Sequence, residues 1–168
     1  MRLSILALAL VLVACGSMPP RDSAPQPARQ QRSGSTEPAG TSTGSANAVL
    51  FRAIALVGTP YHFGGNTPLG GFDCSGLVGY VFRDAANLSL PRTAAQMSEL
   101  PAHELDRDEL RSADLVFFRD RRRITHVGIY VGGQRFVHAP STGGTVRLDS
   151  LDGHWWREHF AFGKRVIR

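Results

Sequence analysis

Cysteine and histidine, the residue types best suited to covalent acyl chemistry, are rare in this chain. Its 168 residues include two cysteines and six histidines. Cys74 lies where the glycine-rich stretch GGNTPLGGFD gives way to the apolar, periodic stretch CSGLVGYVF. A cysteine in the first turn of a helix faces the positive end of the helix dipole and unpaired backbone N–H groups, and both favour the thiolate. The position therefore suits a nucleophile with a lowered pKa, although free cysteines are commonly buried and inert.

A nucleophilic thiol needs a base within hydrogen-bond reach, and the base needs a third group that orients it. His126 opens the predicted strand HVGIYV, His138 closes the predicted strand RFVHA, and the turn signal VGGQ lies between them. Side chains alternate between the two faces of a strand. The two histidines therefore face each other only across a turn with an odd number of residues, either 131–133 or 130–134. A two-residue Gly-Gly turn would place them on opposite faces, so a Cys74–His126–His138 site requires the odd turn.

The other four histidines have plainer interpretations. His62 follows Tyr61 in the glycine-rich loop and is a candidate to line the same site. His103, His154 and His159 lie in polar segments, where surface positions are expected. A zinc site would need about four closely spaced ligands. One cysteine and two histidines fall short of that number, so we expect no metal and no other cofactor.

The first residues have the layout of an export signal. MRLSILALALVLVACGS combines a basic start with an apolar run at 3–14, which is shorter than the roughly 20 residues that span a bilayer. The end of the run, Leu-Val-Ala-Cys, resembles the bacterial lipoprotein box, in which the signal is removed before a lipidated cysteine. The resemblance predicts a signal peptide at 1–14 and a lipid anchor to a membrane at Cys15. Gly16, where Asp usually marks retention at the inner membrane, favours the periplasmic face of the outer membrane in the cell envelope.

Lipidation of Cys15 would leave Cys74 as a lone thiol in an oxidising compartment. Two cysteines in such a compartment would otherwise suggest a disulfide. A lone thiol there is exposed to oxidation. A purely structural role for Cys74 is therefore poorly motivated.

Composition divides the rest of the chain into a linker at 15–46 and one domain at 47–168. The linker contains five of the ten prolines and almost no large apolar residues, so it cannot bury enough surface to fold. The domain has 15 basic and 12 acidic residues, a net charge of +3. That balance is too weak to indicate a nucleic-acid partner. We expect a monomer.

Helical spacing comes first in the domain and strand-like segments follow. Apolar residues recur with helical periodicity from about Asn47 to a stop at Gly58 and Pro60, and again over 74–85. PRTAAQMSEL predicts a short helix. The later strands are predicted from short β-rich segments separated by turn residues: DLVFFR, THVGIYVG, QRFVHA, GTVRLDS and AFGKRVIR. This order predicts an α+β domain in which helices pack on an antiparallel sheet.

These segments, read together, resemble the successive motifs of the NlpC/P60 family of bacterial cell-wall cysteine peptidases. The motifs are YHFGGNTPLGGFDCSGLVGYVF, LPRTAAQM, ADLVFF, HVGIYVG and FVHAPSTG, in family order over about 50–165. The resemblance implies a papain-like α+β fold with a Cys-His-His triad. Cys74 matches the nucleophile, His126 the base and His138 the orienting third residue.

The resemblance also assigns supporting residues. Tyr61 matches a tyrosine whose hydroxyl points at the reaction centre. Asp73 and Ser75, on either side of the nucleophile, match candidates for substrate contacts, and Arg92 matches a residue near the cleft. One departure is Ala113, where the family usually has glycine before aspartate. We expect that turn to be remote from the chemistry.

The activity implied by the resemblance is hydrolysis of peptidoglycan stem peptides or cross-links at diaminopimelate through a thioester. Anchor, linker and catalytic core together resemble the outer-membrane endopeptidases of the family. This arrangement favours the D-alanyl–diaminopimelate cross-link over the γ-D-glutamyl–diaminopimelate bond. An Asp73–Ser75 pair that bound a free amine would favour the second bond. Two alternatives remain open, a non-catalytic wall-binding lipoprotein and an enzyme that transfers the acyl group to an acceptor other than water.

Overall fold

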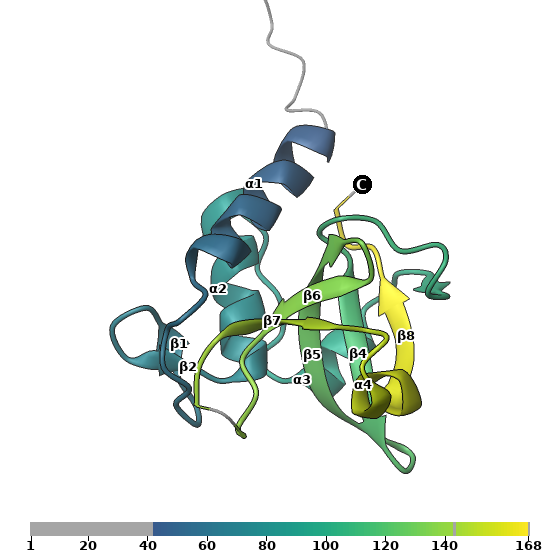
Figure 1. Cartoon of the computed structure of the whole chain (residues 1–168). Coiled ribbons are helices and arrows are strands. Elements are labelled where there is room, and N and C mark those ends of the chain that lie inside the picture. The colour runs from purple at the N-terminus through teal and green to yellow at the C-terminus, as the bar shows by residue number, and fades with distance from the viewer. Residues whose placement is uncertain (1–41, 143, 168) are drawn as a thin grey trace, which may run out of the picture. The chain divides into compact units, whose positions relative to one another are not determined.

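The computed structural model describes residues 42–142 and 144–167 (Figure 1). The predicted signal peptide, Cys15 and most of the predicted linker lie outside these residues. Within the described ranges, no helix is long and apolar enough to cross a membrane. The helices and strands, in chain order, are α1 Ser42–Ala55, β1 Asn66–Thr67, β2 Gly71–Phe72, α2 Cys74–Ala86, α3 Ala94–Ser98, β3 Glu104–Leu105, β4 Leu115–Asp120, β5 Arg123–Gly132, β6 Arg135–His138, β7 Arg147–Ser150, α4 His154–His159 and β8 Phe160–Lys164.

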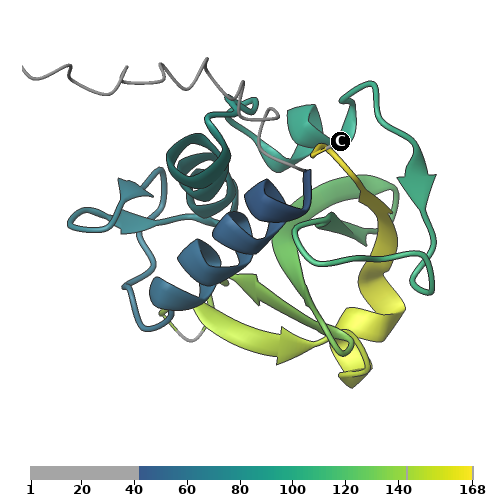
Figure 2. The ribbon, with the colours of Figure 1, turned by 90° about the horizontal axis from the view of Figure 1, so that it is seen from above.

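The main sheet has six strands in the order β3-β8-β4-β5-β6-β7, and every neighbouring pair is antiparallel. Strands β4 to β7 follow one another in space as they do in sequence, and β8 returns to the free edge of β4. Helices α1 and α2 lie side by side against the sheet (Figures 1 and 2). The predicted α+β class, with helices packed on an antiparallel sheet, is confirmed.

Strand alternation sends apolar side chains into two separate clusters. Phe117, Val127 and Ile129 are fully buried among residues of the helices, such as Leu77 and Val81. Residues that point to the opposite face of the sheet form the other cluster, and Trp156 and Phe160 pack at its margin. Its buried members include Val116, Phe118, Tyr130 and Phe136. Each central strand is thus covered on both faces.

Helix α2 begins at Cys74 because the residue before it is an effective cap. The Asp73 side chain accepts a hydrogen bond of 2.7 Å from the N–H of Gly76, and its backbone is extended. At the other end, Asn87 adopts the left-handed conformation, with φ of 51°, and its N–H bonds to the carbonyl of Phe82. The apolar residues between these ends face the core and are fully buried: Leu77, Val78, Val81 and Phe82.

Several sequence-based boundaries change. Helix α1 starts at Ser42, ahead of the expected start near Asn47, and Ala46 packs against the core, so part of the predicted linker belongs to the domain. Helix α1 ends at Ala55, and Gly58 then takes a left-handed φ of 94°. The glycine-rich loop contains the small β1–β2 hairpin, and α4 was not predicted. These elements are short, with few residues from which to read a period.

The β5–β6 connection differs from the predicted odd turn. Its turn has two residues, Gly133 and Gln134, both with positive φ. A bulge at Val131 supplies the extra residue, since Tyr130 pairs with Phe136 and Gly132 with Arg135. The bulge restores the parity that a two-residue turn alone would break.

The pairing register is consequently shifted by two residues from the predicted one. Ile129 pairs with Val137, which places His138 across from Gly128 instead of His126. A Cβ on Gly128 would lie 2.7 Å from the ring of Phe136 and 3.3 Å from the Cβ of His138. The two histidines share a face, as predicted, but they meet diagonally across the space that Gly128 leaves open.

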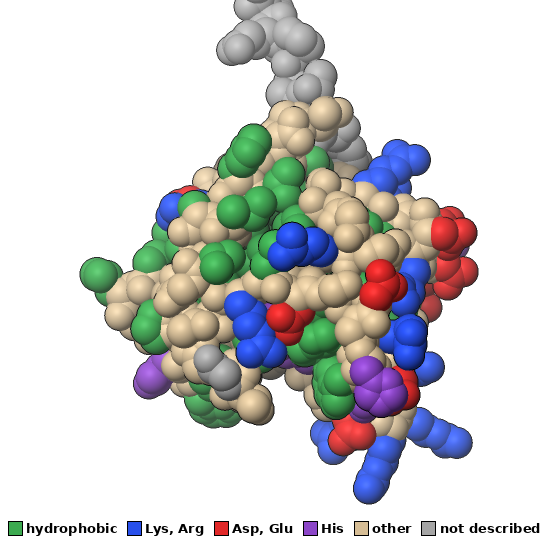
Figure 3. Space-filling model, viewed as in Figure 1, with side chains coloured by type: hydrophobic (Ala, Val, Ile, Leu, Met, Phe, Trp, Pro, Cys, Tyr) green, Lys and Arg blue, Asp and Glu red, His purple; other side chains and the backbone are tan. Residues whose placement is uncertain are grey.

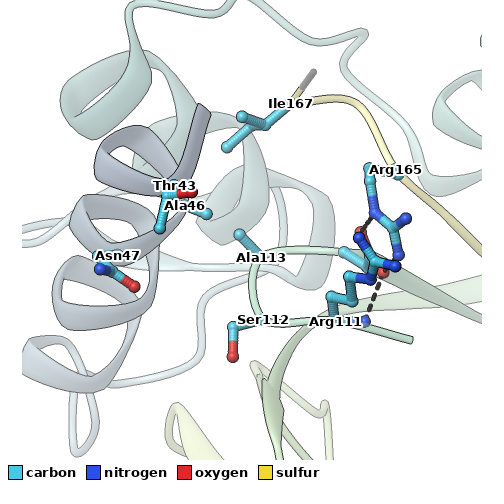
Figure 4. A pocket seen from close by; sticks show the side chains of 9 residues that line it. Thr43, Ala46, Asn47, Arg111, Ser112, Ala113, Arg165 and Ile167 are labelled. Atoms are coloured by element: carbon cyan, nitrogen blue, oxygen red, sulfur yellow. Dashed lines mark hydrogen bonds and ion pairs between the residues drawn. The ribbon is translucent and has the colours of Figure 1, made fainter. Parts of the chain in front are cut away.

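Ala113 occupies a strained turn before β4. Its φ is 73°, a region that glycine enters freely and alanine does not, and its side chain is buried. It contributes to a hollow of about 260 Å³ between α1 and the chain end near Arg165 and Ile167 (Figure 4). This hollow shares no lining residue with the one beside His126 described below. The departure from the family pattern thus lies away from the candidate triad.

The surface in view carries charges of both signs. Acidic and basic side chains are interspersed over the face shown in Figure 3, while hydrophobic side chains gather toward α1 and α2. Phe51 and Ile54 of α1 are among the exposed apolar residues. No single-sign field dominates this face.

A close backbone approach, which tolerates only glycine, holds the start of α2 in place. A Cβ on Gly76 would lie 2.0 Å from the carbonyl oxygen of Gly65, whereas a Cβ on Gly79 would find only Met97, at 4.0 Å. We predict that Gly76→Ala lowers the free energy of unfolding by about 2–3 kcal/mol through overpacking. Gly79→Ala, one turn further along α2, should raise it by about 0.5–1 kcal/mol. Urea unfolding measures both, and equal effects would contradict the close approach.

Candidate active site

The Cys74 sulfur sits at the junction of α2 and β5. Backbone N–H groups of Val127, Ser75 and Cys74 itself point toward it, and each lowers the pKa of the thiol. Val127 directly follows His126, so the sulfur lies beside the backbone that carries the candidate base. The thiol is half-buried. Cys74 lies in the first turn of a helix, as predicted, and that helix packs against β5.

The predicted direction of the Cys74 pKa is wrong. Burial raises the pKa of Cys74 above the 9.0 of an unperturbed thiol, and the nearby carboxylate of Asp73 adds to the rise. The backbone N–H groups oppose this shift without cancelling it. The free protein therefore holds a neutral thiol at neutral pH, and a base must remove its proton when it reacts.

His126 and His138 are in direct contact. Nε2 of His126 lies 2.9 Å from Nδ1 of His138, and the two rings are nearly perpendicular at 89°. His138 is fully buried, and its other nitrogen, Nε2, lies 3.0 Å from Oδ2 of Asp149. The structure thus joins the predicted base and orienting residue in one line and extends that line to a carboxylate.

The carboxylate sets the direction of every proton in this line. An ionised carboxylate only accepts hydrogen bonds, so Nε2 of His138 donates to Asp149. The other nitrogen of His138, Nδ1, must then accept, and Nε2 of His126 donates to it. This assignment leaves the lone pair of His126 on Nδ1, where it can act as a base.

Both histidines are held neutral. Burial lowers the pKa of His126 and of His138 below the ordinary value of 6.5, and repulsion between the two rings lowers that of His126 further. Asp149 pulls both pKa values up, but the effect of burial is larger. A neutral imidazole beside a neutral thiol is the resting state that these surroundings favour.

Asp149 is a site residue that the sequence did not reveal. Its Oδ2 accepts from His138, from Nε and Nη2 of Arg147 at 3.1 Å each, and from the indole of Trp156 at 2.9 Å. Burial alone would raise the pKa of Asp149, but its interactions with Arg147 and His138 hold that pKa below the ordinary value. One signal was available, because GTVRLDS is the strand that follows RFVHA and an antiparallel pair brings an acidic residue of the second strand near the end of the first.

Aromatic rings fix the two imidazoles in place. Trp156 contacts His126 and His138 with ring centroids 5.4 and 4.7 Å apart. Phe118 lies 5.9 Å from His126, and Phe136 lies 4.7 Å from His138. The short helix α4, which the sequence periodicity did not predict, thus contributes the Trp156 ring that packs against both histidines.

The predicted substrate-contact residues form one cluster at the start of α2. Nη2 of Arg92 lies 2.7 Å from Oδ2 of Asp73, and Nη1 lies 3.1 Å from Oδ1 of Asp73 and 2.9 Å from Oγ of Ser75. The backbone N–H groups of Gly64 and Gly76 also donate to Asp73. The carboxylate is thus engaged in capping the helix and pairing with Arg92. Burial raises its pKa, but the bonds from Arg92, Gly76 and Ser75 outweigh that effect and lower it.

Tyr61 packs against the same hydrophobic cluster as Cys74. Burial raises the pKa of the Tyr61 phenol, and its electrostatic interactions with Cys74 and Asp73 add to the rise. His62, the candidate beside it, is exposed, as are His103 and His154. His159 is half-buried and stacks on Trp155 with ring centroids 3.9 Å apart. None of these four belongs to the histidine pair.

A hollow of about 500 Å³ opens beside the candidate base. Its lining includes His126, Arg147, Trp155 and Trp156, with hydroxyls of Thr125 and Thr142. We call it the Arg147 pocket. Over residues 42–142 and 144–167, no group of three or more His, Cys, Asp or Glu side chains is arranged to hold a metal ion. The candidate chemistry is therefore that of a thiol at the start of α2, an oriented imidazole, and a pocket beside that imidazole.

Comparison with known proteins points to one family. The NlpC/P60 family model matches residues 58–165. The chain is 44% identical over 121 residues to murein DD-endopeptidase MepH of Escherichia coli (strain K12), which covers 70% of this chain and 45% of that protein. It is 37% identical over 110 residues to the murein DD-endopeptidase MepS/murein LD-carboxypeptidase of the same strain, covering 66% of this chain and 57% of that protein.

A solved structure of the same family has a similar fold. A protein of Staphylococcus aureus subsp. aureus Mu50, described as similar to a lipoprotein of the NLP/P60 family, superposes with a TM-score of 0.65 at 34% identity. The match covers 74% of this chain and 42% of that one. The chain spans about half the length of the relatives it matches.

The neutral resting state predicts how Cys74 reacts with iodoacetamide. Because burial raises the thiol pKa, the alkylation rate of Cys74 should climb with pH to a midpoint above 9.0, without a fast plateau at lower pH. Mass spectrometry of the peptide containing Cys74 measures the rate. His126→Ala is the matched control and should leave the profile nearly unchanged. A fast plateau between about pH 5 and 7 that His126→Ala abolishes would instead reveal a thiolate–imidazolium pair.

Proposed function

Because the chain belongs to the NlpC/P60 family, we propose that it is a cysteine endopeptidase that hydrolyses peptidoglycan peptides at diaminopimelate, with the D-alanyl–diaminopimelate cross-link as the favoured bond. One observation carries the proposal. The proton direction of His126 is set through His138 by Asp149, and the backbone N–H of Val127, the next residue on the same strand, lowers the pKa of the Cys74 thiol at the start of α2. Structural cysteines have no need of such a line. The curated relatives named murein endopeptidases support the substrate class.

The reaction begins with proton transfer. Nδ1 of His126 takes the proton of the Cys74 thiol as the sulfur attacks the carbonyl carbon of the substrate amide. The imidazolium that forms is stabilised by His138, which accepts from Nε2 of His126 and donates to Asp149. Asp149 keeps its charge throughout, as the acid of a Ser-His-Asp triad does.

The tetrahedral oxyanion needs donors aimed at it. The backbone N–H of Cys74, free of intrahelical bonds in the first turn of α2, is one donor, and the Tyr61 hydroxyl is a second. Tyr61 and Cys74 both pack at the margin of the same hydrophobic cluster, which supports this placement.

Collapse of the oxyanion completes acylation. The C–N bond breaks, His126 returns its proton to the leaving amine, and a thioester with Cys74 remains. A water molecule, deprotonated by His126, then attacks the thioester and releases the acid and the thiol. We call the chain of hydrogen bonds from His126 through His138 to Asp149 the donor line. Every proton that moves passes through Nδ1 of His126, the one nitrogen that the donor line leaves basic.

The state of Asp73 bears on the choice of bond. A free amine of a stem peptide, which would favour the γ-D-glutamyl–diaminopimelate bond, would have to compete with Arg92 and two backbone N–H groups for that carboxylate. Ser75 shares Arg92 in the same cluster. These bonds weaken the case for an amine site there and support the cross-link as the favoured substrate.

We also propose that the chain works from a membrane. The segment at 1–14 acts as a lipoprotein signal, and Cys15 carries the lipid that holds the domain at the periplasmic face of the outer membrane. The support is the sequence LVAC behind an apolar run. Mass spectrometry of the mature N-terminus is the test, and an unmodified Cys15 within the mature chain would contradict the anchor.

The bond is identified by digestion of purified cross-linked muropeptides with the full chain. We predict that mass spectrometry of the products finds uncross-linked tetrapeptides from cleavage between D-alanine and diaminopimelate. Cys74→Ala should remove all activity. Dipeptide products would show cleavage after γ-D-glutamate instead. Binding of muropeptides without any product from the wild-type chain would contradict an enzyme, and incorporation of an added amine in place of water would indicate a transferase.

Asp149 offers a test of the donor line. We predict that Asp149→Asn lowers kcat for cross-link cleavage by about 10- to 100-fold, in the range seen when partners that orient histidines are removed, with little change in KM. The control is Asp152→Asn, an exposed carboxylate in the same segment that pairs with Arg107. A wild-type kcat in Asp149→Asn would show that the direction of the histidine protons does not depend on this carboxylate.

A further inference from the structure

The Arg147 pocket is placed to receive one particular half of the substrate. His126 is both a lining residue of the pocket and the base that must protonate the leaving amine. The leaving group therefore lies on the His126 side of Cys74. The cluster of Asp73, Ser75 and Arg92 is built around the start of α2, and none of its residues lines this pocket.

Arg147 brings a positive charge to that pocket. Its Nε and Nη2 both bond to Asp149, while among residues 42–142 and 144–167 Nη1 makes only a long contact of 3.4 Å with the carbonyl of Thr142. The Arg147 side chain is 41% exposed, and Thr142 lines the same hollow. One edge of the guanidinium is thus fixed by the donor line, and the other retains donors for an anion.

The remaining walls suit an aliphatic chain. Trp155 is 47% exposed, and the ring of Trp156 lies 4.5 Å from it at a steep angle. Two indole surfaces, a guanidinium and the hydroxyls of Thr125 and Thr142 together match a ligand with methylene groups and a carboxylate.

We propose that the Arg147 pocket binds the diaminopimelate residue released by cleavage, with Arg147 holding the free carboxylate on the carbon that bears the scissile nitrogen. The inference rests on the proposed function. In a D-alanyl–diaminopimelate cross-link, that carboxylate is free. In a γ-D-glutamyl–diaminopimelate bond of a stem that continues to D-alanine, the corresponding carboxyl is tied up in an amide. Arg147 is thus a specificity residue that favours the cross-link.

The test compares two cross-linked tetrapeptide dimers, identical except that this carboxylate of the acceptor diaminopimelate is either free or amidated. We predict that the full wild-type chain cleaves the free form with a kcat/KM about 10- to 100-fold higher, as expected for loss of a hydrogen bond to a charged group. In Arg147→Gln the ratio should fall to near one. Arg147→Gln also removes the bonds from Arg147 to Asp149, but any loss of activity from that cause lowers kcat/KM for both dimers alike and cancels in their ratio.

Two further variants separate the roles of charge and geometry and provide a matched control. Arg147→Lys keeps the charge but not the fork and should retain part of the discrimination. Arg135→Gln removes an exposed arginine at the start of β6 and should leave the wild-type ratio unchanged. Equal cleavage of both dimers by the wild-type chain would overturn the inference while leaving the endopeptidase intact. Cleavage of neither dimer would contradict the proposed function itself.

Discussion

The site depends on the hydrogen bonds that converge on a single carboxylate oxygen. Oδ2 of Asp149 accepts from His138, Trp156 and Arg147, all within 3.1 Å. Because an ionised carboxylate cannot donate, this one acceptor determines which nitrogen of His138 carries hydrogen, and through it which nitrogen of His126 is basic. A buried imidazole pair with no such reference would have two proton arrangements of similar energy, and only one of them leaves a base for the thiol.

The fold brings the segments that carry Cys74, His126, His138 and Asp149 together, although they are distant in sequence. Helix α2 begins at Cys74, and the close approach of Gly76 to the Gly65 carbonyl keeps the start of the helix near the glycine-rich loop. The bulge at Val131 sets the register that lets His126 and His138 meet over Gly128. Burial, which raises the pKa of the thiol and lowers that of both imidazoles, makes the resting site neutral. In the proposed mechanism, proton transfer from the thiol is therefore coupled to attack on the substrate.

The sequence was informative where a pattern is long or a residue type is rare. The apolar spacing from Leu77 to Phe82 predicted α2, the β-rich segments predicted the central strands, and the scarcity of cysteine drew attention to Cys74. The register of β5 and β6 was mispredicted because a bulge leaves no mark in alternation. The Cys74 pKa was mispredicted because the helix terminus is visible in a sequence and the depth of burial is not.

Asp149 was missed for a related reason. An aspartate in a strand has many uses, and only the pairing of β6 with β7, together with the unpredicted helix carrying Trp156, gives this one its role. Family resemblance supplied the candidate triad of Cys74, His126 and His138, but not Asp149, which bonds to His138. Sequence patterns therefore located the candidate catalytic residues, whereas Asp149 and Trp156, which contact the two histidines, became apparent only in the assembled fold.

The central claim is that Asp149 holds His138 and His126 as neutral rings with hydrogen on Nε2 of each. Nitrogen-15 NMR of the histidine side chains at pH 7 tests it directly, because protonated and unprotonated ring nitrogens have well-separated shifts. The account predicts hydrogen on Nε2 and a lone pair on Nδ1 for both residues, with the pattern lost in Asp149→Asn. A doubly protonated His126, or hydrogen on its Nδ1, would contradict it.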